Sequence, residues 1–136
     1  MSGRHWAPVY LKAIVTVRQG DAWVDAGAYA ASVGAPVHVL TAWNPDAARP
    51  SETVNRAANE RLRADLVNRG LEPMPALGAD PDSPHVEESW AVVGLSDDEA
   101  RVVGAAFDQV AVFRVTASEL AVLACREDWA VRRALP

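Results

Sequence analysis

Residues 36–115 alternate between short apolar runs and two helical segments whose ends are well marked. The first helix is expected to begin at Ser51, a good N-cap residue, and to end before Gly70, which suits the position after a helix. The second is expected to begin at Ser96, because Glu99 three residues later completes a capping box. The order of elements in this segment constrains the fold more than any other feature of the chain.

The remaining elements are expected to be mostly strands. Pro73 and Pro75 restrict the run LEPMPALG to an edge of the sheet, because proline lacks the N–H group that an inner strand needs. The tail REDWAVRRALP is typical of a short amphipathic helix, and residues 22–35 fit either a short helix or an irregular return. The expected strands are residues 9–17, 36–43, 71–78, 89–95, 110–115 and 119–125.

Along residues 36–115 the order is strand, helix, strand, strand, helix, strand. With one antiparallel sheet and right-handed crossovers, the simplest packing places both helices on one face of the sheet. We therefore expect an α+β fold with a ferredoxin-like βαββαβ core, extended by an N-terminal strand and by a C-terminal hairpin with its short helix. The chain should form a single domain, with its core at residues 36–115 and extensions at residues 1–35 and 116–136.

The composition of the 136 residues argues against several classes of protein. No apolar stretch approaches the roughly 18 residues of a membrane span, and the N-terminus lacks the apolar region of a secretory signal, so we expect a cytoplasmic protein without a membrane partner. The net charge is −5 and the basic residues are scattered, which argues against nucleic acid as a partner. Lys12 is the only lysine, a bias typical of a GC-rich bacterial genome. Cys125, the only cysteine, is expected to be a packed residue.

Polar residues of distant loops are expected to meet at one edge of the sheet. In the expected fold, the loops at residues 43–50 and 78–89 and the junction at residues 108–109 share this edge, and loops on a rigid scaffold are where sites are usually built. Asn55 lies on the inner face of the first helix, where its amide can bind the preceding loop. The expected ligand-binding residues are Trp43, Asn44, Arg49, Ser51, Asn55, Asp80, Glu88 and Gln109.

Acid–base catalysis is one chemistry open to this edge. Its candidates are His85, Glu87 and Glu88, since a histidine beside a carboxylate can relay protons. Adjacent glutamates of a strand point to opposite faces, so only one of the two can face the site. Asn44 or Asn55 would then polarise a carbonyl or phosphate group.

Binding of a metal ion or an anion is a second chemistry to consider at this edge. The acidic residues at 80–88 could offer oxygen ligands to a metal ion, but their spacing matches neither an EF-hand loop nor the HExxH motif, so we predict no metal site. An anion could bind at the N-terminus of the first helix, beside Arg49. The sequence has no glycine-rich nucleotide fingerprint, and no cofactor is expected.

The segments LTAWNP, GADPDSPHVEESW and FDQVAVF, with Ser51, Asn55 and Gly70 between them, resemble a small bacterial family, domain of unknown function 3293. Its pattern is TA-aromatic-NP, an asparagine in the next helix, G-x-DP, E-[E or P]-S and F-G-Q-x-A. The resemblance covers about residues 37–114. Asp108 departs from it, because the family tends to have glycine there. The family name implies no activity, but the resemblance supports the polar edge as the shared feature.

These observations favour a small cytoplasmic binding or accessory domain that acts through the polar edge on a small molecule, an anion or a protein partner. Five tryptophans in a small chain agree with a contact surface, and self-association into a homo-oligomer is open. The alternative is a small enzyme whose site combines acid–base groups with polarising amides. Its residues would be Asn44, Asn55, His85 and either Glu87 or Glu88.

Overall fold

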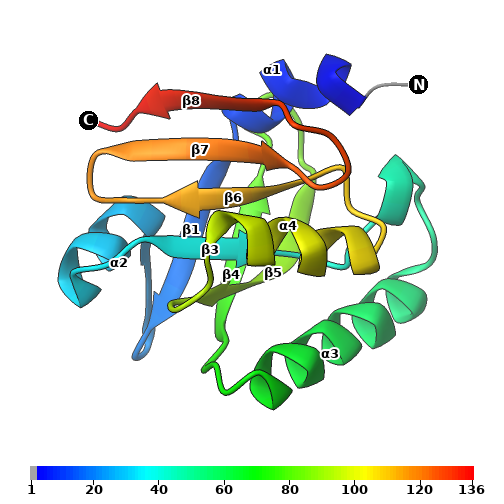
Figure 1. Cartoon of the computed structure of the whole chain (residues 1–136), viewed down its shortest axis with the longest axis horizontal. Coiled ribbons are helices and arrows are strands. Elements are labelled where there is room, and N and C mark those ends of the chain that lie inside the picture. Colours follow the sequence, from blue (N-terminus) through cyan, green and yellow to red (C-terminus); the bar gives the residue numbers. More distant parts are fainter. Residues whose placement is uncertain (1–2) are drawn as a thin grey trace.

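The computed structural model describes residues 3–136, apart from the side chain of Asp46. Its strands are β1 Ile14–Gln19, β2 Ala22–Asp25, β3 Val37–Leu40, β4 Met74–Ala79, β5 Val86–Val92, β6 Ala111–Val115, β7 Glu119–Ala124 and β8 Ala130–Ala134. They form one eight-stranded sheet in the order β2-β1-β4-β5-β3-β6-β7-β8 (Figure 1). Every neighbouring pair in this order is antiparallel.

Four α-helices occur within the described residues: α1 Ala7–Leu11, α2 Ala26–Val33, α3 Glu52–Asn68 and α4 Asp97–Ala106. Short 3₁₀ turns precede α1 at Gly3–Trp6 and lie in the loop before α3 at Pro45–Ala47. Ser51 caps α3 by accepting a hydrogen bond from the Val54 N–H, and Ser96 and Glu99 form the capping box of α4. The two helices with clear capping signals therefore begin where the sequence indicates.

The helices cover both faces of the sheet. Buried residues of α1 and α2 pack with Val37 and Val39 in one apolar cluster, whereas α3 and α4 pack with Leu40 in the other. The sheet curves toward the face with α1 and α2. A Cβ placed on Gly78 of β4 would lie 4.0 Å from the ring of Phe113 of β6, although β5 and β3 separate these strands. In a flat sheet they would be roughly 14 Å apart.

The predicted ferredoxin-like core with two helices on one face is therefore wrong. Two helices lie on each face, and residues 14–25 and 119–134 add two strands at each side of the sheet. The run with Pro73 and Pro75 is not at an edge, because β4 pairs with both β1 and β5. The prolines are tolerated because β1 pairs only with the part of β4 from Ala76 onward, so neither lies in the doubly paired segment.

Two terminal elements also differ from expectation. Within residues 9–17, which were expected to form a strand, α1 extends to Leu11 and β1 begins only at Ile14. Pro8 stands in the first turn of α1, a position where proline favours a helix. The tail forms strand β8 and not a helix, because its backbone pairs with β7 along Glu119–Leu123. An isolated amphipathic pattern does not reveal such a partner.

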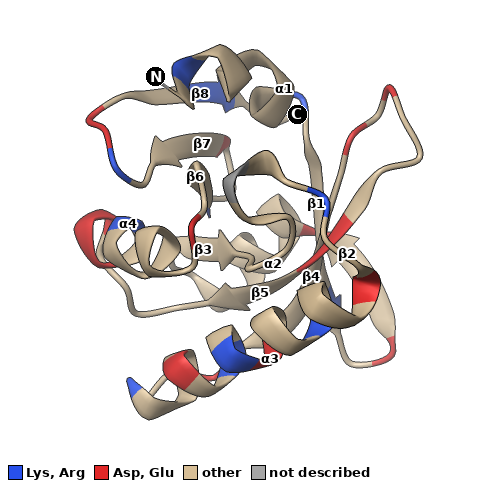
Figure 2. Ribbon diagram, turned by 90° about the vertical axis from the view of Figure 1, so that its right-hand side faces the viewer, with Lys and Arg blue, Asp and Glu red and all other residues tan. Residues whose placement is uncertain are grey.

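Acidic and basic residues are interspersed along α3 (Figure 2). Arg63 pairs with Glu60 at 2.6 Å, and Arg69 pairs with Asp65 at 3.0 Å. Such exposed pairs each stabilise a helix by only about 0.3–0.5 kcal/mol, so the helix is held mainly by its buried face. Across residues 3–136, none of the helices has both the length and the apolar character required to cross a bilayer.

Candidate functional site

A cavity of about 300 Å³ opens on the concave face of the sheet, beside α1. Its walls come from α1, from the loop at residues 41–50, from β4, β5 and the loop between them, and from β6. The cavity therefore lies where the chain leaving β3 meets the β4–β5 hairpin. Its volume is at the small end of the range of ligand pockets, which span about 300–1,000 Å³.

One part of the cavity wall is aromatic. Tyr10 of α1 and Phe113 of β6 pack edge to face, with ring centroids 6.4 Å apart and planes at 83°. Trp6 lies beside Tyr10, also with a centroid distance of 6.4 Å. Val39 of β3 adds an aliphatic surface. This part of the cavity suits an apolar or aromatic group of a ligand.

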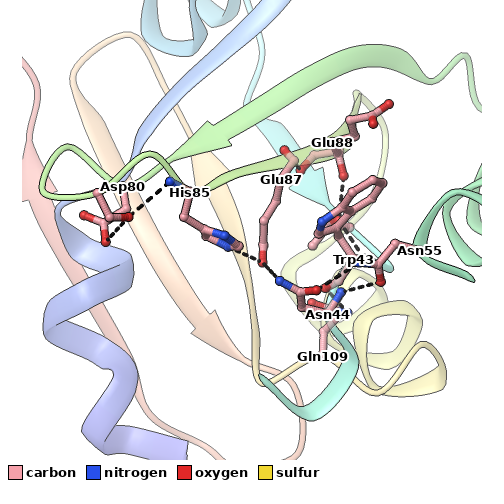
Figure 3. A network of polar contacts seen from close by, with 11 residues as sticks. Trp43, Asn44, Asn55, Asp80, His85, Glu87, Glu88 and Gln109 are labelled. Atoms are coloured by element: carbon pink, nitrogen blue, oxygen red, sulfur yellow. Dashed lines mark hydrogen bonds and ion pairs between the residues drawn. The ribbon is translucent and has the colours of Figure 1, made fainter. Parts of the chain in front are cut away.

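Another part is polar and centres on Glu87 of β5 (Figure 3). His85 Nε2 lies 3.0 Å from Glu87 Oε2, and Asn44 Nδ2 donates to the same oxygen at 3.4 Å. The Glu87 side chain is only 24% exposed. Burial raises the pKa of the Glu87 carboxyl, while the hydrogen bond and charge of His85, the Asn44 amide and the Arg49 charge oppose this rise.

The Glu87 carboxylate also affects the pKa of the Tyr10 hydroxyl. Burial and the negative charge of Glu87 raise the pKa of Tyr10 to about 12. The phenol therefore keeps its proton at neutral pH and can donate a hydrogen bond. The cavity thus combines a carboxyl group that takes up a proton more readily than usual with a phenol that retains one. The phenol is suited to hydrogen bonding, and of these two groups only the pKa of Glu87 is shifted toward the range of acid–base catalysis.

Glu87 faces the cavity and Glu88 does not. Along β5, Glu87 and Ser89 line the cavity, while Trp90 packs in the cluster under α3 and α4, as the twofold alternation of a strand requires. Glu88 is exposed on the α3 face, where its carboxylate lies 3.6 Å from Nε of Arg56. Of the two adjacent glutamates, only Glu87 is therefore placed to touch a ligand in this cavity.

Asn44 is held in position by Asn55. The Asn44 backbone N–H donates to Asn55 Oδ1 at 2.9 Å, and Asn55 Nδ2 donates to Asn44 Oδ1 at the same distance (Figure 3). Asn55 is 2% exposed, on the inner face of α3. Asn44 has φ of +50°, a left-handed conformation that asparagine tolerates better than most residues. Asn55 thus anchors the loop and aims the Asn44 amide at Glu87, without lining the cavity itself.

Residues 40–112 match the family described as "Protein of unknown function (DUF3293)". The match covers more than half of the chain. This chain belongs to the DUF3293 family. The predicted resemblance over about residues 37–114 is thereby confirmed. No curated protein and no solved structure matches the chain.

The segment that matches DUF3293 contains the polar part of the cavity. It begins in β3 and runs through the loop at residues 41–50, α3 and the β4–β5 hairpin to Val112 of β6. Asn44, His85 and Glu87 all lie within it. The aromatic residues Trp6 and Tyr10 lie before it, so this cavity is completed by a part of the protein outside the matched segment.

The structure brings together most of the residues expected at the polar edge. Six of them line the cavity: Asn44, Arg49, Asp80, His85, Glu87 and Gln109. The other four, Trp43, Ser51, Asn55 and Glu88, do not line it. Gln109 donates to the Trp43 carbonyl at 3.3 Å and so joins the turn after α4 to the loop at residues 41–50. The Ser51 hydroxyl already accepts the Val54 N–H at 3.2 Å, so this oxygen satisfies one donor that an anion would need.

Asp80 is engaged in the loop between β4 and β5. Its carboxylate accepts the Asp82 N–H at 2.9 Å and the Ser83 hydroxyl at 3.2 Å. The part of the chain that the structure describes contains no group of three or more His, Cys, Asp or Glu side chains arranged to hold a metal ion. The role of Asp80 here is to shape one wall of the cavity.

Sequence reasoning missed the aromatic wall and a second anchor of the loop. The strand expected at residues 9–17 includes Tyr10 and follows Trp6. The spacing of four residues between these aromatic residues, with Pro8 between them, is instead a helix signal. Asn59 was also missed. One turn after Asn55 on α3, it accepts the Ala42 N–H at 3.0 Å and donates to the Glu88 carbonyl at 3.2 Å. Its place four residues after Asn55 was the available signal.

Proposed function

We propose that this DUF3293 protein binds a small organic molecule in the cavity beside α1, with Glu87 as the central polar contact. The observation that carries the proposal is the Glu87 carboxyl itself, which lies mostly buried inside a cavity lined by aromatic rings. Burying an ionisable group lowers stability unless it is well paired. Groups of this kind in a cleft are frequent markers of binding and catalytic sites.

The geometry around Glu87 supports the same proposal. Asn55 holds Asn44, and Asn44 together with His85 holds one carboxylate oxygen of Glu87. A binding site of high selectivity requires polar groups that are already oriented before the ligand arrives. Here a ligand would meet an oriented carboxylate at an apolar surface, and little side-chain entropy would be lost on binding.

The test is a thermal-shift screen of metabolites on three proteins: the wild type, Glu87→Gln and Glu88→Gln. A ligand that binds the folded state raises the melting temperature by mass action. We expect a ligand that stabilises the wild type and Glu88→Gln to a similar extent and Glu87→Gln much less. Glu88→Gln is the matched control, because it makes the same chemical change at the next residue, on the other face of β5. Equal shifts in all three proteins would count against the proposed site.

Acid–base catalysis in the same cavity is a second candidate, favoured by the contact between His85 and a Glu87 carboxyl whose pKa is raised. For this cavity, its residues reduce to His85, Glu87 and Asn44, because Asn55 and Glu88 do not line it. Once a ligand is found, its turnover should be measured on wild type and Glu87→Gln. If Glu87 is catalytic, Glu87→Gln should have a lower kcat while it still binds the ligand. An unchanged kcat would exclude a catalytic role for Glu87.

A further inference from the structure

The Glu87 carboxylate has one oxygen available to a ligand. Both side-chain contacts to this carboxyl, from His85 and from Asn44, fall on Oε2. Within residues 3–136, Oε1 receives no hydrogen bond. A mostly buried carboxylate is stabilised best by a donor of opposite charge, because the attraction between the two charges offsets the desolvation cost of burial. This oxygen therefore favours a ligand with a protonated amine.

Arg49 provides the opposite charge at the same cavity. Its side chain is exposed and forms part of the cavity lining, and its charge acts on Glu87. None of the carboxylates that the structure describes lies within ion-pairing distance of the Arg49 guanidinium. Pro50 follows directly and restricts the backbone of Arg49 to an extended conformation. The planar guanidinium of Arg49 can pair with the carboxylate of a ligand through two hydrogen bonds.

The aromatic wall and the volume limit the rest of the ligand. Tyr10 and Phe113 present ring surfaces to the cavity, and the Tyr10 hydroxyl has no hydrogen-bond partner among the described residues. A volume of about 300 Å³ equals the share of roughly ten water molecules in the liquid. This space suits a molecule of about a dozen non-hydrogen atoms and is too small for a dinucleotide.

We propose that the cavity binds a free amino acid with an aromatic or large apolar side chain. Its ammonium group contacts Glu87 Oε1, its carboxylate pairs with Arg49, and its side chain packs against Tyr10 and Phe113. The proposal rests on the proposed function, because it names the chemical class of the ligand for that same cavity. It explains why two opposite charges, each with unused hydrogen-bonding capacity, line one small space with an aromatic wall.

The test uses four probes that share a phenyl group: L-phenylalanine, 2-phenylethylamine, 3-phenylpropionate and 2-phenylethanol. They carry both charges, the amine alone, the carboxylate alone and no charge. Affinity is measured by isothermal titration calorimetry on the wild type, Glu87→Gln and Arg49→Gln. Glu88→Gln and Arg56→Gln are the matched controls, because these two residues pair with each other outside the cavity.

Phenylalanine should bind the wild type about tenfold more tightly than either singly charged probe, which corresponds to about 1.4 kcal/mol per charged contact. Glu87→Gln should remove the advantage of phenylalanine over 3-phenylpropionate. Arg49→Gln should remove its advantage over 2-phenylethylamine. The two controls should retain both advantages, since their substitutions leave the cavity unchanged.

Three outcomes would overturn the inference: phenylalanine binds no better than a singly charged probe, its advantages survive both cavity substitutions, or none of the charged probes binds. If 2-phenylethanol alone binds and depends on Glu87, the amino-acid class is wrong and the proposed function stands. If no compound in this set or in the metabolite screen binds in a way that depends on Glu87, both the amino-acid class and the proposed function are wrong. Circular dichroism of each variant confirms that a lost affinity does not reflect a lost fold.

Discussion

Asn55→Ala is the sharpest test of how the cavity is held together. Asn55 is 2% exposed and makes two hydrogen bonds to Asn44, each 2.9 Å long. The substitution removes both bonds and leaves the Asn44 N–H in a partly buried position without its acceptor. It creates little additional strain, because alanine is the residue best suited to the interior of α3.

The expected loss of stability follows from these contacts. Losing the bond from Asn55 Nδ2 costs about 1 kcal/mol, and leaving the Asn44 N–H without its acceptor costs about 1–3 kcal/mol. Replacing asparagine by alanine in a helix offsets up to about 0.7 kcal/mol of this loss. The variant should therefore be about 2 kcal/mol less stable than the wild type.

Urea denaturation measures this change as a lower midpoint at unchanged slope. Asn68→Ala is the control, because Asn68 is the exposed last residue of the same helix and should change stability by less than about 0.5 kcal/mol. Any ligand that depends on Glu87 should also bind Asn55→Ala more weakly, since Asn44 is no longer held against the carboxylate. A loss below about 0.5 kcal/mol for Asn55→Ala would refute the reasoning.

Three further predictions concern pH, packing and a strained turn. Because the folded state holds the pKa of Glu87 above its ordinary value of 4.5, wild-type stability should fall as pH rises from that value through the raised pKa. Glu87→Gln removes this dependence. In urea denaturation, the stability of Glu87→Gln relative to the wild type should therefore rise as pH increases above 4.5, and a relative stability that falls instead would contradict the prediction. Gly104→Ala should be destabilised, because its Cβ would lie 2.5 Å from Cys125 Sγ and 2.7 Å from Val112 Cγ1. The destabilisation from overpacking, about 1–3 kcal/mol, is expected to exceed the roughly 1 kcal/mol that alanine contributes through its higher helix propensity. Adding Cys125→Ala to this variant should recover part of the lost stability. An unchanged melting temperature for Gly104→Ala would contradict the prediction. Asp108→Ala should be about 1 kcal/mol less stable than Asp108→Gly, because φ of +57° there favours glycine, and equal stability of the two would contradict a strained turn.

The signals that could be read from the sequence were local ones. Ser51 and Ser96 mark helix starts because a cap bonds to backbone groups only two or three residues away. The inward position of Asn55 followed from helix geometry alone. The family pattern also places Asp108 at a position where glycine is usual, and the structure gives Asp108 the left-handed backbone that glycine adopts freely, with its carboxylate 2.7 Å from Arg126.

The fold class was mispredicted because the decisive contacts join distant segments. The tail at Ala130–Ala134 has an amphipathic pattern that suits a helix as well as a strand, and pairing with β7 selects the strand. The second face of the sheet needed a cover, which α1 and α2 provide. Neither the partner strand nor the uncovered face is a property of the segment itself.

The sequence alone determined where the two capped helices start, the family of the chain and several of the polar residues that line the cavity. Only the tertiary structure decided which of two adjacent glutamates faces the cavity, which aromatic residues complete it, and that helices lie on both faces of the sheet. The physical reason is one of range. Caps and helix faces depend on hydrogen bonds and periodicity within a few residues, whereas burial and the raised pKa of Glu87 depend on α1, β5 and the loop after β3 meeting in space.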